Sequence, residues 1–367
     1  MSTFITGATG FLGSYLAAGM LAAGEHLFVH VRCANRHDGM DRLRRALEVV
    51  SVDSITALED RVTICPGDLS AEMLGLSKED IELTLSSCDR YLHCGANVRF
   101  DMELEQARDV NVCGTRELLR LAKRRTSIGG LNRVDLVSTA FVAGRTSGVV
   151  FEERLDLCVE FSNTYEQSKF EAEEVAWDSM GELPICLHRP SIVVGEANSG
   201  QTTNFTALYA PIRIYAMGLW RTIPGNRDST LDIVPVDYVR DAILELRTRP
   251  ESLGRCFHIT AGRERTITVG EVVSVVESFF PDRKEILFRD PERWSRLVLP
   301  ILKRVPIRRL SLVAGVATAY LPYMTSNPLF DDKHARDLLD SVGIAPPAVR
   351  DYVVNLLEFA VKSDFGS

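Results

Sequence analysis

The sequence has few of the residue spacings that bind metals or build disulfide frameworks. Its eight cysteines are scattered, and no two of them have the Cys-x-x-Cys spacing of zinc sites and thioredoxin-like sites. Among the seven histidines, His26 and His30 are four apart, but the apolar residues between them predict a strand. Residues two apart are the nearest neighbours on one face of a strand, so this pair is too widely spaced for one metal ion. We therefore expect reduced, mostly buried thiols and no metal site.

The chain also lacks an excess of positive charge. It has 42 Lys and Arg against 50 Asp and Glu, a formal net charge of −8, which disfavours a nucleic-acid-binding protein because such proteins need a basic face. The first apolar residues are followed at once by glycines, so we expect no signal peptide. With 46% hydrophobic and 25% charged residues the composition is globular, and we expect a cytoplasmic protein.

The first half of the chain alternates short β-branched runs with longer periodic ones. The predicted strands are residues 4–6, 27–32, 62–66, 90–93, 134–138 and 185–188, and the predicted helices between them include residues 12–23, 41–50, 104–125 and 164–180. Strand and helix in alternation predict a parallel sheet with helices on both faces. Right-handed crossovers make this a doubly wound, Rossmann-type α/β fold, with its ligand crevice at the carboxyl ends of the strands.

The regularity changes after residue 194. A stretch rich in Gly, Asn, Ser and Thr, residues 195–204, precedes several aromatic residues and a mostly helical tail. We therefore divide the chain into a Rossmann core, residues 1–194, and a smaller, mainly helical substrate-binding region, residues 195–367. Residues 231–262 are expected to return to the core, because residues 255–260 have the pattern of one more strand.

The first predicted strand runs directly into a glycine-rich loop, TGATGFLG at residues 6–13, and an apolar helix follows. Gly7, Gly10 and Gly13 allow a tight turn, a close approach of the backbone to a pyrophosphate, and close packing of the helix. The helix N-terminus adds free N–H groups and a positive dipole. The sequence therefore predicts a dinucleotide-binding loop, which also includes Thr9, Phe11 and Leu12.

The end of the second predicted strand bears on the choice between NAD and NADP. A carboxylate there binds the ribose 2′-hydroxyl, whereas an arginine accommodates a 2′-phosphate. Arg32 occupies this position and the first acidic residue after it is Asp38, which favours NADPH. Arg42 on the next helix is a candidate second phosphate ligand, since a guanidinium fork suits phosphate oxygens. Arginine is common in this chain, so an ordinary surface role stays open for both arginines.

Tyr165 and Lys169 have the Tyr-x-x-x-Lys spacing at the start of a predicted helix, which places both side chains on one face. A phenol has a pKa of about 10, and a neighbouring ammonium lowers that pKa by favouring the phenolate. Such a pair can exchange a proton with a carbonyl oxygen as a hydride moves. Thr139 follows the fifth predicted strand, where its hydroxyl is expected to hydrogen-bond the same carbonyl. These three residues form the predicted catalytic group.

Together the motifs resemble an extended short-chain dehydrogenase/reductase over about the first 260 residues. Within that superfamily the chain is most similar to the thioester reductase and fatty acyl-CoA reductase branch. The matching segments are residues 6–13, 31–32, 67–69, 93–100, 111–115, 138–140, 189–191 and 234–239, together with Tyr165 and Lys169. Two positions depart from the family pattern: Ser191 stands where glycine is usual, and Gly95 where alanine is frequent.

The resemblance implies roles for residues that spacing alone does not assign. Asp68 and Leu69 would flank the adenine, Ala96 would line the cofactor channel, and Asn111 would support Lys169 through a water molecule. A turn-forming role for Asp68 and a helix-interior hydrogen bond for Asn111 stay open as alternatives. Further cofactor contacts are implied for Pro190, Ser191 and Val193.

The branch also implies an acyl thioester as the substrate, reduced to an aldehyde and a free thiol, with the alcohol as the product of a second hydride transfer. No adenylation or carrier-protein segment is recognised in the sequence, so we expect the thioester to arrive on coenzyme A or an acyl carrier protein. Two alternatives stay open. One is an NADP-dependent carbonyl, alcohol or nucleotide-sugar oxidoreductase, and the other is a non-catalytic dinucleotide-binding regulator.

Residues 283–309 carry nine basic and three acidic residues in a chain that is acidic as a whole. This segment is a candidate site for an acidic carrier protein or for the phosphates of coenzyme A. The apolar runs beside it are too broken by proline and charge to span a bilayer, so any membrane contact is expected to be peripheral. An acyl-chain lid and a solvated basic face are the alternatives. The sequence does not indicate an oligomeric state.

Overall fold

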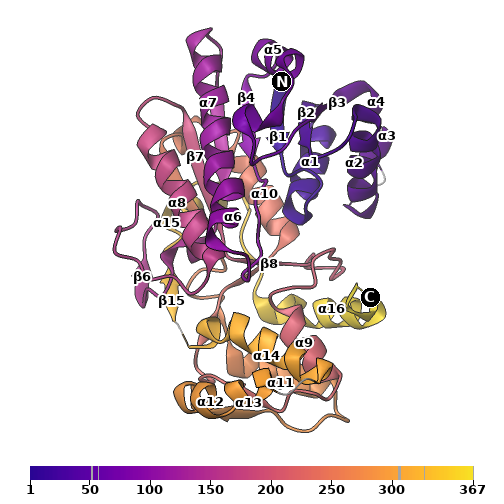
Figure 1. The fold of residues 1–367 in the computed structure, drawn as a ribbon, viewed down its shortest axis with the longest axis vertical. Coiled ribbons are helices and arrows are strands. Elements are labelled where there is room, and N and C mark those ends of the chain that lie inside the picture. The colour runs from indigo at the N-terminus through magenta and orange to yellow at the C-terminus, as the bar shows by residue number, and fades with distance from the viewer. Residues whose placement is uncertain (51–52, 57, 305–306, 326, 367) are drawn as a thin grey trace.

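The computed structural model describes residues 1–50, 53–56, 58–304, 307–325 and 327–366. Its centre is a seven-stranded sheet in which every neighbouring pair of strands is parallel, in the order β12-β7-β5-β4-β1-β2-β3. This arrangement confirms the predicted Rossmann-type fold, and Figure 1 shows helices on both sides of the sheet. The strands are β1 (Ser2–Thr6), β2 (His26–Val31), β3 (Val62–Pro66), β4 (Arg90–His93), β5 (Arg133–Val137), β7 (Ile185–Pro190) and β12 (Arg255–Ile259).

Successive side chains of each strand enter different cores, as the alternation of a strand requires. Phe4 of β1 belongs to the core on one face and Ile5 to the core on the other. The core that contains Ile5 is covered by α1 (Phe11–Ala22), α2 (Arg36–Val50), α10 (Val236–Leu246) and α15 (Lys333–Leu339). The core that contains Phe4 is covered by α5 (Lys78–Ser87), α7 (Gly114–Ser127) and α8 (Thr164–Ser179).

Two predicted helices differ from the structure in an informative way. The helix predicted at residues 41–50 begins earlier, at Arg36, because the side chain of Asn35 accepts a hydrogen bond from the Asp38 N–H at 2.9 Å. The helix predicted at residues 104–125 is α6 (Leu104–Arg108) and α7 joined by a π-helical turn (Asp109–Cys113).

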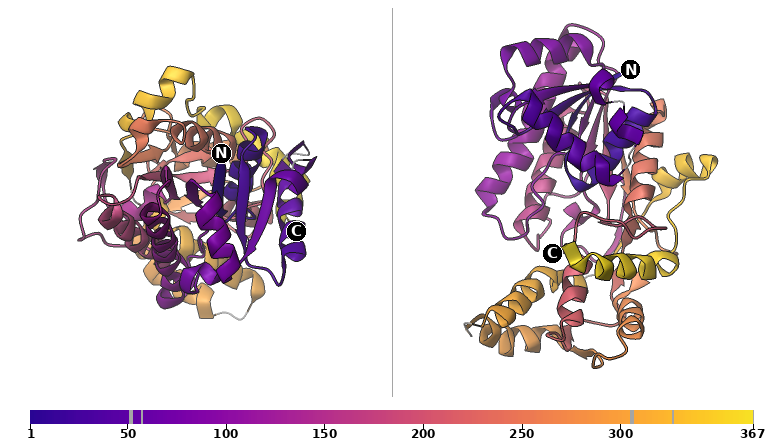
Figure 2. Two further views of the ribbon diagram at one scale, coloured as in Figure 1. Left: turned by 90° about the horizontal axis from the view of Figure 1, so that it is seen from above. Right: turned by 90° about the vertical axis from the view of Figure 1, so that its right-hand side faces the viewer.

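The C-terminal region is built around its own hydrophobic core, which includes Tyr209, Trp220, Val273 and Leu356. Figure 2 shows it below the sheet, with the last long helix at the junction between the two parts. Its helices are α9 (Tyr209–Ala216), α11 (Val269–Phe279), α12 (Pro291–Leu297), α13 (Leu299–Arg304), α14 (Arg308–Tyr320) and α16 (Val349–Lys362). Its short strand pairs are β8 (Ile192–Val194) with β11 (Ile233–Pro235), β9 (Thr222–Pro224) with β14 (Leu287–Arg289), and β10 (Thr230–Leu231) with β13 (Ile267–Thr268).

The chain passes between the two parts more than once. Residues 236–246 pack on α1 as α10, and β12 forms the edge of the large sheet beside β7. A later segment also returns: β15 (Pro328–Phe330) pairs with β6 (Gly148–Val150), and α15 packs on β12. This second return has no signal in the sequence, because it depends on contacts between segments about 180 residues apart in the chain. The division near residue 194 stays a proposal.

Two short helices, α3 (Asp53–Thr56) and α4 (Leu58–Arg61), precede β3. Among the helices that the structure describes, none combines the length and the apolar content needed to cross a membrane.

Candidate active site

The glycine-rich loop lies between β1 and α1, where its tight geometry excludes side chains at two positions. Gly7 has a φ of +77°, and a Cβ there would lie 2.5 Å from the backbone nitrogen of Gly95. A Cβ at Gly13 would lie 2.0 Å from the carbonyl oxygen of Gly7. The helix that follows has Gly10 as its N-cap, with no side chain to occupy the first free N–H groups. The loop therefore presents backbone donors and a positive helix end, as a pyrophosphate requires.

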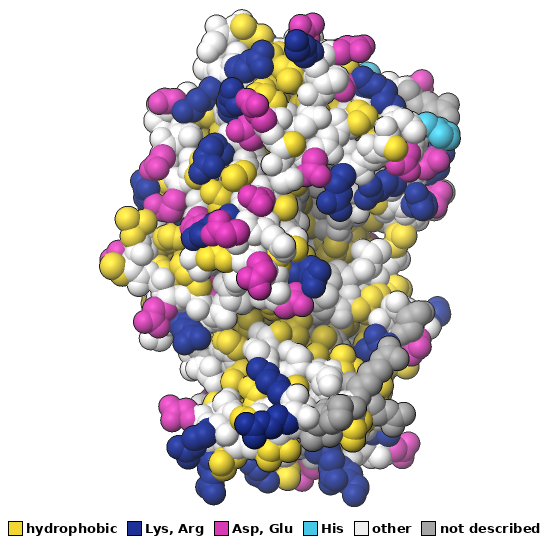
Figure 3. Space-filling view, in the orientation of Figure 1, with side chains coloured by type: hydrophobic (Ala, Val, Ile, Leu, Met, Phe, Trp, Pro, Cys, Tyr) yellow, Lys and Arg dark blue, Asp and Glu magenta, His cyan; other side chains and the backbone are white. Residues whose placement is uncertain are grey.

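One cavity of about 400 Å³ begins at this loop and continues past the carboxyl ends of the strands into the C-terminal region. Figure 3 shows the surface hollowed between the two parts, with hydrophobic side chains gathered in the hollow. Twelve of the residues predicted to form the site line this cavity: Gly7, Gly10, Phe11, Leu12, Gly13, Ala96, Thr139, Tyr165, Lys169, Pro190, Ser191 and Val193. Folding thus brings the predicted phosphate loop and the predicted catalytic group to one continuous space.

Thr139 and Tyr165 lie together on the cavity wall. Thr139 follows β5 and its Oγ accepts a hydrogen bond from the Phe141 N–H at 3.3 Å. Removal from water raises the pKa of Tyr165 to about 12, and a hydrogen bond with the Thr139 hydroxyl opposes this rise. The sequence predicts a lowered pKa from a neighbouring ammonium, but the effect of burial on the pKa is larger. The phenol is consequently protonated at neutral pH.

Lys169 is buried one turn along α8 from Tyr165. Its Nζ donates a hydrogen bond to the carbonyl oxygen of Val137 at 2.9 Å, which anchors the ammonium at the end of β5. Burial lowers the pKa of Lys169. The lysine is therefore fixed beside the site by a backbone acceptor.

Asn111 lies behind this group, in the π-helical turn. Its Nδ2 donates to Ser168 Oγ at 2.9 Å and to the carbonyl oxygen of Asn97 at 3.0 Å, and its Oδ1 accepts the Asn97 N–H at 2.7 Å. Asn111 does not line the cavity itself; it connects the residue before Lys169 to the loop after β4. A π-helical turn often marks a functional position, because the extra residue redirects one side chain.

The residues predicted at the adenosine end lie outside the cavity lining, near the ends of β2 and β3. Arg32 is exposed, and its carbonyl oxygen accepts a hydrogen bond from the guanidinium of Arg42. The Asp68 carboxylate accepts hydrogen bonds from the N–H and the hydroxyl of Ser70, which lower the pKa of Asp68, and Arg32 lowers it further. The turn-forming role of Asp68 is thus present in the structure. Thr9 is half-buried in the glycine-rich loop.

Leu69 lies against Gly95, one of the two positions that depart from the family pattern. A Cβ at Gly95 would lie 2.8 Å from Leu69 Cδ1 and 3.0 Å from Thr6 Oγ1. Alanine at position 95 would therefore need the Leu69 side chain to move. The glycine leaves room for a large residue at position 69.

Several lining residues were not among those predicted to form the site. Phe100, Tyr320 and Tyr323 line the cavity, and the ring of Phe100 lies 5.8 Å from that of Tyr165 and 5.9 Å from that of Tyr323. The Tyr323 hydroxyl donates to the carboxylate of Glu166, the residue after Tyr165. Tyr323 is far from Tyr165 in the chain, so only the fold brings these aromatic rings together.

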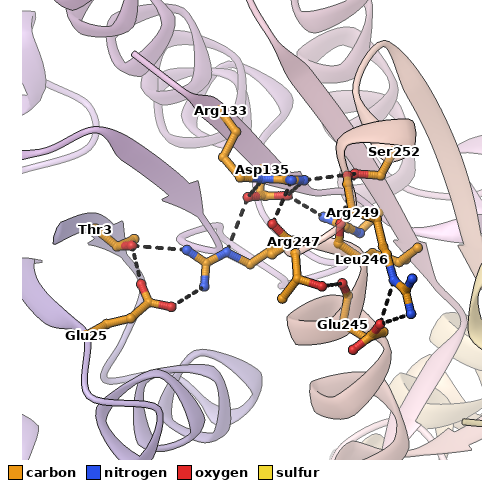
Figure 4. A network of polar contacts seen from close by, with 11 residues as sticks. Thr3, Glu25, Arg133, Asp135, Glu245, Leu246, Arg247, Arg249 and Ser252 are labelled. Carbon is orange, nitrogen blue, oxygen red and sulfur yellow. Dashed lines mark hydrogen bonds and ion pairs between the residues drawn. The ribbon is translucent and has the colours of Figure 1, made fainter. Parts of the chain in front are cut away.

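One group of possible metal ligands lies away from this cavity, in the centre of the sheet. Asp135, Cys186 and His188 are buried with their ligand atoms within 4.8 Å of one another. The Asp135 carboxylate is already bound by Arg133, by Arg247 and by His188 Nε2. Figure 4 shows the two arginines converging on this carboxylate. Two buried guanidinium groups make a poor environment for a further cation. We therefore assign Asp135, Cys186 and His188 a structural role.

Comparison with known proteins agrees with this geometry. The family described as male sterility protein, an NAD-binding family, matches residues 5–243. The fatty acyl-CoA reductase wat of Drosophila melanogaster is 28% identical over 272 residues, which are 66% of this chain and 53% of that protein. The nonribosomal peptide synthetase asaC of Aspergillus flavus is 27% identical over 332 residues, which are 83% of this chain and 32% of that protein.

A solved structure, the terminal R domain from the myxalamid PKS-NRPS biosynthetic pathway, superimposes with a TM-score of 0.83 at 26% identity. The alignment covers 99% of this chain and 91% of that domain. The chain itself spans between a third and about half of the length of the two curated relatives. The match over the glycine-rich loop, the parallel sheet and the Tyr165 region shows that the chain belongs to the male sterility protein family of nicotinamide dinucleotide-binding proteins, within the short-chain dehydrogenase/reductase class of oxidoreductases.

Proposed function

We propose that this chain uses NADPH to reduce the carbonyl group of an acyl thioester to an aldehyde. The observation that carries the proposal is the single cavity that joins the glycine-rich loop to Thr139, Tyr165 and Lys169. Relatives with matching sequence include a protein named as a fatty acyl-CoA reductase and a nonribosomal peptide synthetase. A fatty acyl-CoA and the acyl chain of a peptide synthetase have a thioester in common, which is why we favour that group over a ketone or a nucleotide sugar.

The reaction divides between the cofactor and the side chains. The glycine-rich loop with Gly7, Gly10 and Gly13 would hold a reduced nicotinamide dinucleotide, which would supply a hydride for the thioester carbonyl carbon. The hydroxyls of Thr139 and Tyr165 donate hydrogen bonds to the carbonyl oxygen and stabilise the negative charge that develops on it. Tyr165 then gives its proton to that oxygen, which yields a thiohemiacetal. The carbon–sulfur bond then breaks, the proton of the thiohemiacetal hydroxyl passes to the leaving sulfur, and the products are an aldehyde and a free thiol.

The protonated state of Tyr165 suits this direction of reaction. A phenol with a pKa of about 12 carries its proton at neutral pH, and it donates that proton as negative charge develops on the carbonyl oxygen. Lys169, held by the Val137 carbonyl, stabilises the phenolate left after the proton transfer. Asn111 positions this helix through Ser168 and does not touch the reacting atoms. Whether a second hydride reduces the aldehyde to an alcohol depends on whether the aldehyde leaves first.

The proposed preference for NADPH rests on the residues expected to contact the adenosine end of the cofactor. Arg32 lies at the end of β2 with its side chain exposed, and Arg42 on α2 is hydrogen-bonded to its backbone. No acidic residue intervenes between Arg32 and Asp38. This position suits a 2′-phosphate and offers no carboxylate to a ribose hydroxyl.

The thioester carrier is coenzyme A or an acyl carrier protein. Exposed basic side chains lie on and beside α12 and α13: Arg289, Arg293, Arg296, Lys303 and Arg304. Figure 3 shows Lys and Arg side chains gathered at the lower end of the molecule. Both carriers are anionic, so this surface would attract either one.

The proposal is tested by following NADPH oxidation with acyl-CoA and acyl-carrier-protein thioesters. We expect turnover with thioesters, release of a free thiol in equal amount, and an aldehyde that can be trapped with a hydrazine. Turnover with free ketones or sugar nucleotides but with none of the thioesters would show another oxidoreductase of the same class. Dinucleotide binding with no turnover of any substrate would favour the alternative of a non-catalytic dinucleotide-binding regulator.

A further inference from the structure

The cavity does not end at the catalytic group. Beyond Tyr165 it continues into the C-terminal region between α9 and α11, a part that we call the apolar arm. We define it by Ile212, Trp220, Ile223, Ile286 and the four valines of α11 that line the cavity. One face of α11 supplies Val269, Val272, Val273 and Val276, the spacing that aligns four side chains on one side of a helix. The four side chains are 3–6% exposed and belong to the C-terminal core, so this valine face is both part of that core and a wall of the cavity.

The strand pairs indicate which end of the apolar arm is nearer the catalytic group. Ile192 and Val193 lie beside the catalytic group, and β8 pairs with β11 in the C-terminal region. The segment before β11 contains β10, which pairs with β13, and β13 leads directly into α11 at Val269. At the other end of α11, the ring of Phe280 contacts that of Tyr215. Val269 is therefore nearer the catalytic group and Val276 nearer the far end of the arm.

The polar ring atoms of Trp220 and Tyr215 on the arm have hydrogen-bond partners. The Trp220 indole N–H donates to the carbonyl oxygen of Thr222, and the Tyr215 hydroxyl donates to the carbonyl oxygen of Lys284 at 3.2 Å. These rings therefore turn apolar faces to the cavity. Asn204 and Thr206 are hydrogen-bonded to each other through the Thr206 hydroxyl at 2.6 Å.

The arm also lacks charge. The lining residues that the structure describes include no Asp, Glu, Arg or His and a single Lys, Lys169, which lies at the catalytic end. A substrate with an ammonium group would find no carboxylate in the arm, and a peptide would bury N–H and C=O groups without partners. An aliphatic chain has neither cost, and its burial against an apolar cavity wall is favourable in free energy.

We propose that the apolar arm binds an uncharged, straight aliphatic acyl chain, with its thioester carbonyl at Thr139 and Tyr165 and its methyl end toward Val276. This inference names the substrate class of the reductase proposed above and rests on it. The carrier, coenzyme A or a protein, remains outside the arm and does not affect the argument.

The first test compares straight-chain thioesters from two to twelve carbons on both coenzyme A and pantetheine. We expect kcat/KM to rise about fourfold per added methylene until the arm is full, the gain that burial of one methylene gives. Aminoacyl and dipeptidyl thioesters of similar length should be reduced far more slowly than the aliphatic ones. A flat chain-length profile, or a preference for the aminoacyl thioesters, would overturn the inference.

The second test plugs the arm. Val276→Phe should lower kcat/KM for the dodecanoyl thioester by about tenfold or more and leave the acetyl thioester unchanged, because only the long chain reaches that position. Val275→Phe is the matched control on the same helix: Val275 is half-buried on the outer face, outside the cavity, and its replacement should leave the profile unchanged. Equal effects of the two substitutions would contradict the assignment.

A third measurement does not need turnover. Trp220 lines the arm, so saturable binding of 1-decanol should change tryptophan fluorescence, and the change should be absent in Trp220→Phe. No saturable binding together with thioester turnover would overturn the arm and leave the proposed reductase intact. Saturable binding without turnover of any thioester would support the arm and overturn the proposed reductase. This readout also covers the case in which Val276→Phe fails to fold.

Discussion

The hydroxyl of Tyr323 donates a hydrogen bond to the carboxylate of Glu166, which directly follows Tyr165 in the chain. Glu166 is buried, and it also accepts hydrogen bonds from the N–H of Ser162 at 2.8 Å and the side chain of Asn163 at 3.2 Å. Asn163 in turn caps α8 through the Glu166 N–H. The segment that contains Tyr323 thus holds the first turn of the helix that carries Tyr165 and Lys169.

Loss of this hydrogen bond should cost stability. We expect Tyr323→Phe to lower the free energy of unfolding by about 1.5–3 kcal/mol, the range for hydrogen bonds to charged groups. A double-mutant cycle with Glu166→Ala, measured by urea denaturation, isolates the pair from the packing of the ring. Coupling of about 1 kcal/mol or more supports a direct interaction, and additive effects would contradict it.

Lys169 should be needed for the chemical step and not for folding alone. Lys169→Met retains the length of the side chain and removes the ammonium that stabilises the Tyr165 phenolate, so we expect kcat to fall about 10²–10⁴-fold. NADPH binding, followed by fluorescence, distinguishes a lost cofactor site from a lost catalytic group. The matched control is Lys123→Met, which removes a lysine paired with Glu182 on the surface and should leave kcat unchanged.

Arg32 should determine the preference for NADPH over NADH. Arg32→Gln removes a charged contact with the 2′-phosphate, so KM for NADPH should rise about 10- to 100-fold while KM for NADH stays unchanged. The control is Arg45→Gln, since Arg45 is exposed on the same helix as Arg42 and hydrogen-bonds the carbonyl oxygen of Asp41. Equal increases in KM for the two cofactors would place the 2′-phosphate elsewhere.

The buried network around Asp135 should contribute strongly to stability. Arg133 binds Asp135 through two hydrogen bonds of 2.8 Å, and Arg247 connects the same carboxylate to Thr3 and Glu25 near the amino ends of the strands (Figure 4). Asp135→Asn leaves two buried guanidinium groups without their shared counter-charge, so we expect a loss of about 3–5 kcal/mol in the free energy of unfolding.

The neighbouring pair of Arg249 and Glu245 is a control for this substitution, because it is partly exposed and lies in the same part of the fold. Arg249→Ala should cost less than about 1 kcal/mol, as exposed ion pairs do. Urea denaturation compares the two variants. A loss below 1 kcal/mol for Asp135→Asn would mean that the network relaxes around the missing charge.

The elements that the sequence predicts well are those whose signals are local. The glycine-rich loop, the strand before it and the helix after it are contiguous, and Tyr165 and Lys169 are one helical turn apart. Contacts between distant segments carry no such signal. The pairing of Tyr323 with Glu166 is one example. Another is the valine face of α11, whose spacing predicts a buried helix face but does not distinguish a packed core from the wall of a cavity.

Electrostatics in the site also depends on burial, which the sequence does not show. The Tyr-x-x-x-Lys spacing predicts a lowered phenol pKa, whereas the structure raises the pKa of Tyr165 to about 12 because the hydroxyl is removed from water. The backbone at Asn111 is a second example. Asn111 lies in a π-helical turn that packs on α8, whereas periodicity alone predicts a regular helix.

His93, at the end of β4, is buried beside the catalytic group in its neutral form. Its Nδ1 lies 2.7 Å from the hydroxyl of Thr6, which also accepts the N–H of Gly95 at 3.1 Å. The hydrogen bond between the Thr6 hydroxyl and Nδ1 holds the imidazole ring at the end of β1. Burial and the charge of Lys169 lower the pKa of His93 to about 3.

This lowered pKa predicts a loss of stability in acid. In the unfolded chain a histidine has a pKa of about 6.5, so between that pH and about 3 the unfolded state binds a proton at His93 that the folded state does not. Above pH 6.5 His93 is neutral in both states and costs no stability. Below pH 6.5 the free energy of unfolding falls by about 1.4 kcal/mol for each pH unit. Urea denaturation from pH 7.5 to 4.5 should show a slope that is shallower by this amount in His93→Gln than in the unmodified protein. An equally steep slope in His93→Gln would show that His93 binds its proton in the folded state as it does in the unfolded chain.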